Sequence, residues 1–307
     1  MSTFQDLLQS LRDSTQHQQV RIQLIQGIQE MTECPLIVYA ADFGKSHPAV
    51  PNSINSADKT GFSDLIEGLE GDALDVLIHS PGGAANATEQ IVGMLRDNFA
   101  SVRFIVPHAA KSAATLMVLA GDAVLMDDRS ELGPTDPQIA KPTFGGTVFV
   151  PAQAVLDGLE IAKSLVEREG EKVLPLLVPL LHQYDLSILQ VCQEAIGLAK
   201  DLAYRWLVTY MLKDLDDREE RSRNIADALS DRTRFLSHAK PIRIQEAIEL
   251  GLKVEDMRDT PELREKVWKL YCAIEILFDR TRAVKLYENA VGTSFYKSIP
   301  PNPISPE

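Results

Sequence analysis

Two short turns in the sequence combine residue types that could stabilise negative charge and attack a carbonyl group. In the first, His79-Ser80-Pro81-Gly82-Gly83, paired glycines follow an apolar run, so the backbone can approach a ligand closely and expose its N–H groups. In the second, Pro107-His108-Ala109-Ala110-Lys111-Ser112, a serine stands where an apolar run passes through a turn into a small-residue helix. Free N–H groups at the start of a helix favour an alkoxide or an oxyanion. Taken alone, paired glycines after a strand are more often only a tight turn, and a serine at a helix start is more often only an N-cap.

Both turns follow predicted strands of an α/β protein. Strands and helices are expected to alternate, with strands at 35–40, 74–78, 102–106 and 123–126, and helices near 62–69, 86–99 and 112–120. Near-continuous apolar strands separated by helices favour a mainly parallel sheet. Because ligands gather outside the carboxyl ends of such strands, the two turns are positioned for a shared site.

The rest of the chain is predicted to be mostly helical. Helices are expected over 2–31, 151–169, 185–212, 243–250 and 261–288. The last of these begins with Thr260 as the cap and Pro261 at the first position. The proline-rich tail after Gly292 is predicted to be disordered.

Charge and cysteine usage exclude several function classes. The chain has 31 Lys and Arg against 44 Asp and Glu, a net charge of −13, which disfavours nucleic acids and anionic membrane surfaces. Its three cysteines, Cys34, Cys192 and Cys272, show no CxxC spacing, so neither a zinc cage nor a disulfide framework is expected. No apolar stretch approaches the roughly 20 residues of a membrane span, and no signal peptide is apparent. These features predict a cytoplasmic protein.

Three motifs in order resemble a known family. They are Leu77-Ile78-His79-Ser80-Pro81-Gly82-Gly83, Ala109-Ala110-Lys111-Ser112-Ala113-Ala114-Thr115-Leu116 and Ser130-Glu131-Leu132-Gly133-Pro134-Thr135-Asp136-Pro137-Gln138-Ile139. Together with Ser237-His238-Ala239-Lys240-Pro241-Ile242, they resemble the serine dehydrogenase proteinase family. That family is a branch of the ClpP/crotonase superfamily related to signal peptide peptidase A.

The resemblance implies a fold and a division of the chain. The fold would be a ClpP/crotonase-like spiral of ββα units with added N- and C-terminal helices. The expected divisions are an N-terminal helical extension (1–31), a peptidase domain (32–258), a C-terminal helix (259–290) and a disordered tail (291–307).

The resemblance also assigns the nucleophile and the oxyanion hole. Aligning Leu119-Ala120-Gly121 with the corresponding helix of Clp peptidases puts the nucleophile at Ser112. Gly82, Gly83 and the N–H of Ala113 would form the oxyanion hole. Acyl transfer needs such a hydroxyl, together with fixed donors about 3 Å from the developing oxyanion.

The position of the general base in Clp peptidases holds a different residue in this sequence. The Clp histidine would fall at or beside Thr135-Asp136, where no histidine stands, and the signal peptide peptidase branch uses a lysine instead. Lys141 and Lys163 are the candidates, and Lys163 lies in an apolar stripe of the helix that begins at residue 151. Burial on that face would lower its pKa and make it a base, although its stem could equally follow the edge of the core.

The other polar residues near these motifs have open roles. Asp136, flanked by prolines, is expected either to orient a base or to cap a turn. His79 and His108 are structural or are alternative bases, and His238 is expected to anchor a local turn. Lys111 is expected to be structural or to face the substrate.

These observations predict a cytosolic serine endopeptidase that cleaves extended peptides through an acyl-enzyme on Ser112, with a Ser-Lys dyad. Two alternatives remain, a crotonase-like enzyme that acts on an acyl thioester and a catalytically degenerate scaffold that binds peptides. The glycine turn lacks the GxGxxG spacing, so no nicotinamide cofactor is expected, and no metal is expected. Beside a peptide or protein substrate, the expected partner is a second copy of the chain. The apolar surface of the 261–288 helix predicts a homo-oligomer, at least a dimer.

Overall fold

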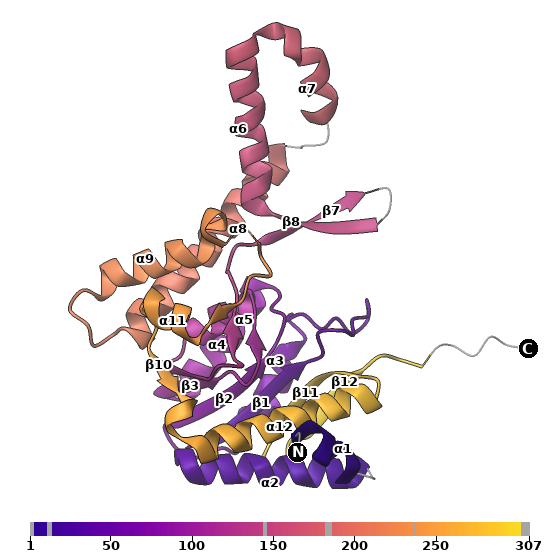
Figure 1. Ribbon diagram of the computed structural model, residues 1–307, viewed down its shortest axis with the longest axis vertical. Coiled ribbons are helices and arrows are strands. Elements are labelled where there is room, and N and C mark those ends of the chain that lie inside the picture. The colour runs from indigo at the N-terminus through magenta and orange to yellow at the C-terminus, as the bar shows by residue number, and fades with distance from the viewer. Residues whose placement is uncertain (1–2, 11–13, 144–145, 182–185, 236, 302–307) are drawn as a thin grey trace, which may run out of the picture.

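The computed structural model describes residues 3–10, 14–143, 146–181, 186–235 and 237–301 (Figure 1). A seven-stranded sheet lies at its centre. In spatial order its strands are β10 (Val254–Asp256), β5 (Ala123–Met126), β3 (Ser101–Ile105), β2 (Ala73–His79), β1 (Leu36–Ala41), β11 (Ala283–Asn289) and β12 (Ser294–Ser298). The first five are parallel, whereas β11 pairs antiparallel with both β1 and β12. The predicted α/β class and mainly parallel sheet are confirmed.

Helices cover both faces of this sheet, which is why β1 and β5 are apolar along their whole length. On one face, Leu36 and Val38 pack against α2 (Ser14–Thr32) and α12 (Pro261–Arg280). On the other face, Ile37 packs in the same core as the helices α3 (Asp58–Ile66), α4 (Ala85–Asn98), α5 (Ala113–Leu119) and α8 (Leu186–Trp206). The short helix α1 (Thr3–Ser10) contacts α12.

A second, three-stranded sheet lies beside the carboxyl ends of the central strands. Its strands are β4 (Ala109–Ala110), β6 (Glu131–Leu132) and β9 (Ile242–Arg243), in that spatial order. β4 and β6 are parallel, and β9 is antiparallel to β6. Outside the sheets, the chain also forms the π-helical turn η2 (Leu207–Met211), α9 (Arg218–Ser230), α10 (Arg232–Phe235), α11 (Ile244–Leu250) and η3 (Met257–Asp259).

An arm projects from the sheet, at the top of Figure 1. It consists of the hairpin β7 (Gln138–Thr143) and β8 (Gly146–Pro151), followed by α6 (Ala152–Glu169), η1 (Glu171–Val173) and α7 (Leu174–Leu181). The predicted helix over 151–169 is confirmed, whereas the hairpin was not predicted.

The C-terminal predictions are partly wrong. The predicted 261–288 helix ends at Arg280, since Thr281 adopts an extended backbone, and the residues after it form β11. β12 lies within the predicted disordered tail, of which residues 302–307 are outside the described residues. The apolar side chains Val267, Leu270 and Ile274 of α12 pack inside this chain, so they do not supply the dimer surface that the sequence suggested.

Candidate active site

Ser112 lies in the turn between β4 and α5 and has a backbone conformation that non-glycine residues rarely adopt. Its φ is 51° and its ψ is −118°. Such strain persists only where the surroundings impose it, and it is concentrated at functional sites. Here Lys111 N–H donates to Ser80 O at 2.9 Å, and Thr115 Oγ1 donates to Ala110 O at 2.7 Å. These bonds fix both sides of the turn that carries the serine.

The glycine turn packs directly against Ser112. A Cβ on Gly82, whose φ is 96°, would lie 2.5 Å from Lys111 O and 2.8 Å from Ser112 Cβ. A Cβ on Gly83 would lie 2.3 Å from the backbone of Ile54. Only glycine fits at either position, so the two turns approach each other as the sequence suggested.

Two backbone donors are free beside the serine. The N–H groups of Gly83 and Ala113 donate no hydrogen bond among the residues that the structure describes. The N–H of Gly82 donates to Ser80 Oγ at 3.2 Å. The free pair suits an oxyanion between the glycine turn and α5, and Gly82 contributes close packing rather than a free donor.

A cleft of about 710 Å³ opens over Ser112. Its walls come from the loop before α3, the glycine turn, the segment after β6, the hairpin and α8, and its lining residues are Asn52, Ser53, Ile54, Asn55, Pro81, Gly82, Gly83, Ala84, Ala85, Asn86, Ser112, Ala113, Leu116, Thr135, Pro137, Gln138, Phe149, Ala195, Leu198, Ala199 and His238. An opening of this size accommodates several residues of a peptide.

His238 lines the same cleft and is bound to Asp136. The distance from His238 Nδ1 to Asp136 Oδ1 is 2.7 Å, and their side chains are 28% and 5% exposed. The structure thus brings Asp136 to a histidine that follows it by 102 positions. The prediction that His238 anchors a local turn is wrong. The sequence signal for a role of His238 at the site is its position in Ser237–Ile242, the segment that resembles the family in addition to the three motifs.

Lys163 does not have the surroundings that the sequence predicted. Its side chain is 57% exposed, and its Nζ forms an ion pair with Glu160 at 2.6 Å. The apolar stripe of α6 buries Val155 and Ala162 beside α8, whereas Lys163 faces outward. The prediction of a desolvated lysine is therefore wrong. Lys141 lies half-buried in β7, and neither lysine is among the described residues that line the cleft.

The alternative histidines face α12 and do not line the cleft in the described part of the chain. His79 is buried and packs on Phe43 and Tyr271. Its pKa is lowered to about 3, mainly by burial and in smaller part by the charge of the nearby His108. His108 stacks on Tyr271, and burial also lowers its pKa. Because a His79 with this low pKa is neutral at neutral pH, its 3.8 Å approach to Glu275, whose pKa burial raises to about 7, is not an ion pair. Both histidines are thus weak bases.

Lys111 is structural. Its Nζ lies 2.8 Å from Glu131 and donates to Leu132 O at 3.0 Å, so it ties the Ser112 turn to β6. Burial lowers its pKa, against the opposing effect of Glu131. The side chain therefore points away from the nucleophile.

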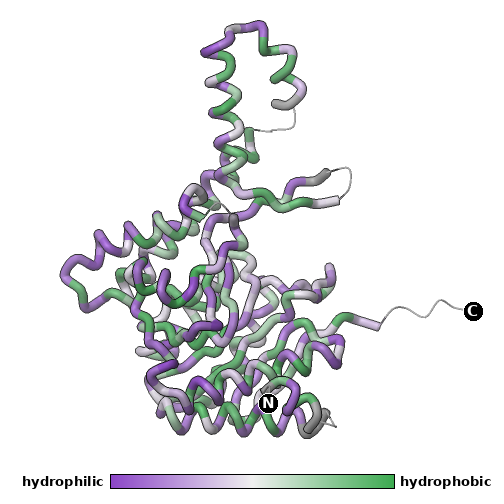
Figure 2. The backbone as a smooth tube through the Cα atoms, in the orientation of Figure 1, coloured by the Kyte–Doolittle hydropathy of each residue, from purple (hydrophilic) through white to green (hydrophobic). Residues whose placement is uncertain are grey.

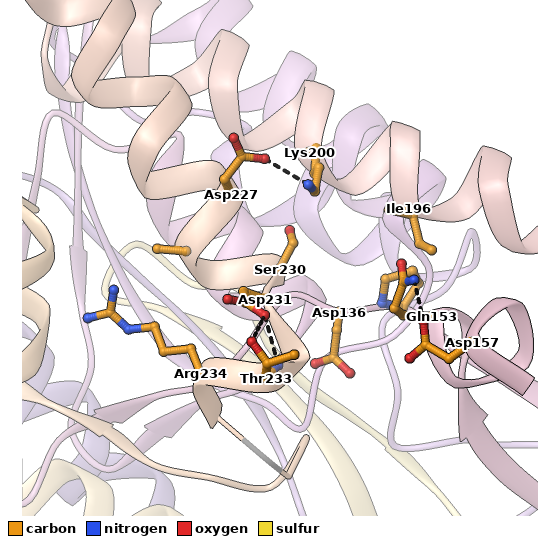
Figure 3. A pocket seen from close by; sticks show the side chains of 12 residues that line it. Asp136, Gln153, Asp157, Ile196, Lys200, Asp227, Ser230, Asp231, Thr233 and Arg234 are labelled. Atoms are coloured by element: carbon orange, nitrogen blue, oxygen red, sulfur yellow. Dashed lines mark hydrogen bonds and ion pairs between the residues drawn. The ribbon is translucent and has the colours of Figure 1, made fainter. Parts of the chain in front are cut away.

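A second cavity, of about 670 Å³, shares the lining residue Pro137 with the cleft, and Asp136 also lines this second cavity (Figure 3). Figure 3 shows Asp136 between Thr233 and Gln153 on its wall. Two of its carboxylates have neighbouring donors: Lys200 Nζ lies 2.7 Å from Asp227 Oδ1, and Asp231 accepts a hydrogen bond from Thr233 Oγ1. Asp136 therefore lines the second cavity and stands in the chain between Thr135 and Pro137, which line the Ser112 cleft.

The described residues contain neither a metal-binding cluster nor a membrane-spanning helix. No group of three or more His, Cys, Asp or Glu side chains within them could hold a metal ion. None of the helices in the described ranges is sufficiently long and apolar to cross a bilayer.

Solved structures to which the chain is similar include two of the 1510-N membrane-bound stomatin-specific protease. One is a serine-to-alanine variant, with a TM-score of 0.41 and 18% identity, matched over 70% of this chain and 79% of that one. The other is a lysine-to-alanine variant in complex with a substrate peptide, with a TM-score of 0.39 and 16% identity, matched over 80% and 82%.

Sequence comparison shows the family of this chain. The uncharacterized proteins MJ0137 and MJ1495 of Methanocaldococcus jannaschii are 30% and 31% identical to this chain over 64% and 59% of its length. The matches span only 58% and 51% of those two proteins. The profile of the ClpP-like SDH-type serine proteinases matches residues 67–276, more than half of the chain and the part that carries both turns, Asp136 and His238. The chain therefore belongs to the family of ClpP-like SDH-type serine proteinases.

Proposed function

We propose that this chain is a cytosolic serine endopeptidase that cleaves extended peptides through an acyl-enzyme on Ser112. The observation that carries the proposal is the strained serine at the base of the cleft, next to the free N–H groups of Gly83 and Ala113. Membership of a family of serine proteinases supports peptides as the substrates. The three cysteines form no disulfide, which suits a reducing compartment.

The proposed reaction uses these groups in sequence. Ser112 Oγ attacks the peptide carbonyl carbon, and the carbonyl oxygen becomes an oxyanion that accepts hydrogen bonds from Gly83 and Ala113. Such a donor contributes about 3–4 kcal/mol to the transition state. The backbone of residues 52–55 forms one wall of the cleft and offers an extended substrate a surface along which its own backbone can lie.

The proposal is tested with a fluorophosphonate probe that reacts with activated serines. We expect the wild-type chain to be labelled at Ser112, located by peptide mass spectrometry, and the Ser112→Ala variant to remain unlabelled. A folded wild-type chain that is not labelled would overturn the proposal. Peptide binding without labelling would then favour the scaffold, and tight binding of a coenzyme A thioester would favour the crotonase-like enzyme.

We also propose a homo-oligomer, now on the basis of the arm and not of α12. Figure 2 shows hydrophobic segments along the arm. Large apolar side chains on it are exposed, among them Phe149, Ile161, Leu176 and Val178. Apolar side chains gathered on a projecting element are typical of contacts between subunits. We expect light scattering to give at least a dimer mass at micromolar concentration, and a monomer mass would contradict this.

A further inference from the structure

We infer that His238 is the general base that activates Ser112, and that Asp136 is the positioning residue that orients His238. This inference rests on the proposed peptidase function and replaces the lysine that the sequence suggested. The observations that carry it are the composition of the cleft, the contact between His238 and Asp136, and the sheet from which all three residues emerge.

The composition of the cleft singles out His238. Its other lining residues in the described part of the chain are apolar side chains, amides, hydroxyls, prolines and glycines. None of these takes up a proton near neutral pH, whereas imidazole does. Ser112 Oγ has no hydrogen-bond partner among the described residues, and catalytic hydrogen bonds commonly tighten only when substrate binds.

The contact with Asp136 orients the imidazole for this role. A carboxylate accepting from Nδ1–H at 2.7 Å fixes the tautomer that leaves the lone pair of Nε2 free to accept a proton. The same carboxylate stabilises the imidazolium that forms. Asp136 is itself held in place, because the neighbouring Thr135 N–H donates to Leu229 O at 2.9 Å. Asp136 is almost fully buried, so solvent screens this interaction little.

The three-stranded sheet brings the three residues to one edge. Ser112 follows β4 by two residues, and Asp136 follows β6 by four, at the carboxyl ends of two parallel strands. His238 precedes β9 by four residues, and β9 runs antiparallel to β6, so its amino end lies at that same edge. The strands are paired at Ala110, Leu132 and Ile242. A further bond, from Gly133 N–H to Thr115 Oγ1 at 3.0 Å, ties the segment of Asp136 to the helix that follows Ser112.

The proton transfers of this mechanism balance. As Ser112 Oγ forms its bond to the carbonyl carbon, its proton moves to His238 Nε2. The imidazolium then donates that proton to the leaving amine as the C–N bond breaks, which leaves the acyl-enzyme. His238 next takes a proton from water as the water oxygen attacks the ester carbon. It returns a proton to Ser112 Oγ as the carboxylic product leaves.

The test compares His238→Ala, Asp136→Asn and the control Lys163→Ala for cleavage of a fluorogenic peptide. We expect kcat/KM to fall by about 10³-fold or more for His238→Ala, and kcat by about 10²–10⁴-fold for Asp136→Asn with KM little changed. Lys163→Ala should keep wild-type activity, because its side chain lies on the surface. Added imidazole should restore part of the cleavage by the His238→Ala variant, which a purely structural role would not allow.

Failure of the His238 inference and failure of the proposed peptidase function give different results. Full activity of a folded His238→Ala variant would overturn the inference, while labelling of wild-type Ser112 would leave the peptidase proposal standing. An unlabelled wild-type chain would overturn both. If His238→Ala does not fold, the nearly isosteric His238→Gln variant serves in its place, and cleavage by it at the wild-type rate would again overturn the inference. An inactive Lys163→Ala variant would return the base to the lysine.

Discussion

Replacing Gly82 by alanine is expected to abolish peptide cleavage, with a fall in kcat/KM of at least about 100-fold. The added Cβ would lie 2.5 Å from Lys111 O, 2.8 Å from Ser112 Cβ and 2.9 Å from Ala113 N, so the nucleophile and an oxyanion donor must both move. A displacement of about 1 Å is enough for a loss of that size. The φ of 96° adds backbone strain of about 1–2 kcal/mol. Cleavage is measured with a fluorogenic peptide, and unfolding with urea.

Gly93→Ala is the matched control for this variant. Gly93 lies inside α4, and a Cβ there would meet nothing within 4 Å. The same substitution should therefore leave cleavage unchanged and raise the free energy of unfolding by about 0.5–1 kcal/mol, because alanine favours the helix. Wild-type activity in Gly82→Ala would show that the two turns do not form the reacting centre.

Replacing Lys285 by methionine is expected to lower the free energy of unfolding by about 3–5 kcal/mol. Lys285 is buried in β11, and its Nζ lies 2.8 Å from both oxygens of the buried Asp58. Burial alone would raise the pKa of Asp58, but the Lys285 ammonium lowers it below its usual range, so the two form an ion pair. Removing one partner leaves a buried charge without its main compensation. Urea unfolding monitored by circular dichroism measures the loss.

The double variant Asp58→Asn/Lys285→Met is the control, because it removes both charges together. We expect it to be more stable than Lys285→Met alone, since no buried charge is left uncompensated. Equal stability of Lys285→Met and the wild type would contradict the prediction. The pair also supports the cleft: Lys285 Nζ donates to Ser53 O at 2.7 Å, and Asp58 accepts from Asn55 N–H at 2.9 Å. Cleavage by Lys285→Met should therefore fall as well.

The error at the C-terminus shows where local patterns fail. β11 carries Lys285 and Glu288 within its apolar run, a composition that did not suggest a central strand. Both charges are buried there because their partners come from distant parts of the chain. Lys285 binds Asp58, 227 positions away, and Glu288 binds Arg21, 267 positions away, at 2.7 Å. A sequence window contains neither partner.

The error at Lys163 has a similar origin. The periodicity of α6 correctly predicted a helix with an apolar stripe. How much of that stripe is covered depends on the neighbouring elements, and α6 stands in a projecting arm with α8 beside it. Val155 and Ala162 are buried, while Lys163 remains in solvent. Periodicity gives the faces of a helix and leaves open what covers them.

The sequence by itself determined the elements whose signals are local: the apolar parallel strands, the glycine turn after β2 and the serine turn before α5. Their chemistry depends on adjacent residues, and adjacent residues are what a sequence shows directly. Only the tertiary structure decided which titratable side chain shares the cleft with Ser112. His238 and Asp136 are joined through the pairing of β4, β6 and β9, whose strands contribute only two residues each. Such short strands carry almost no periodic signal, and their pairing is fixed by the packing of the whole chain.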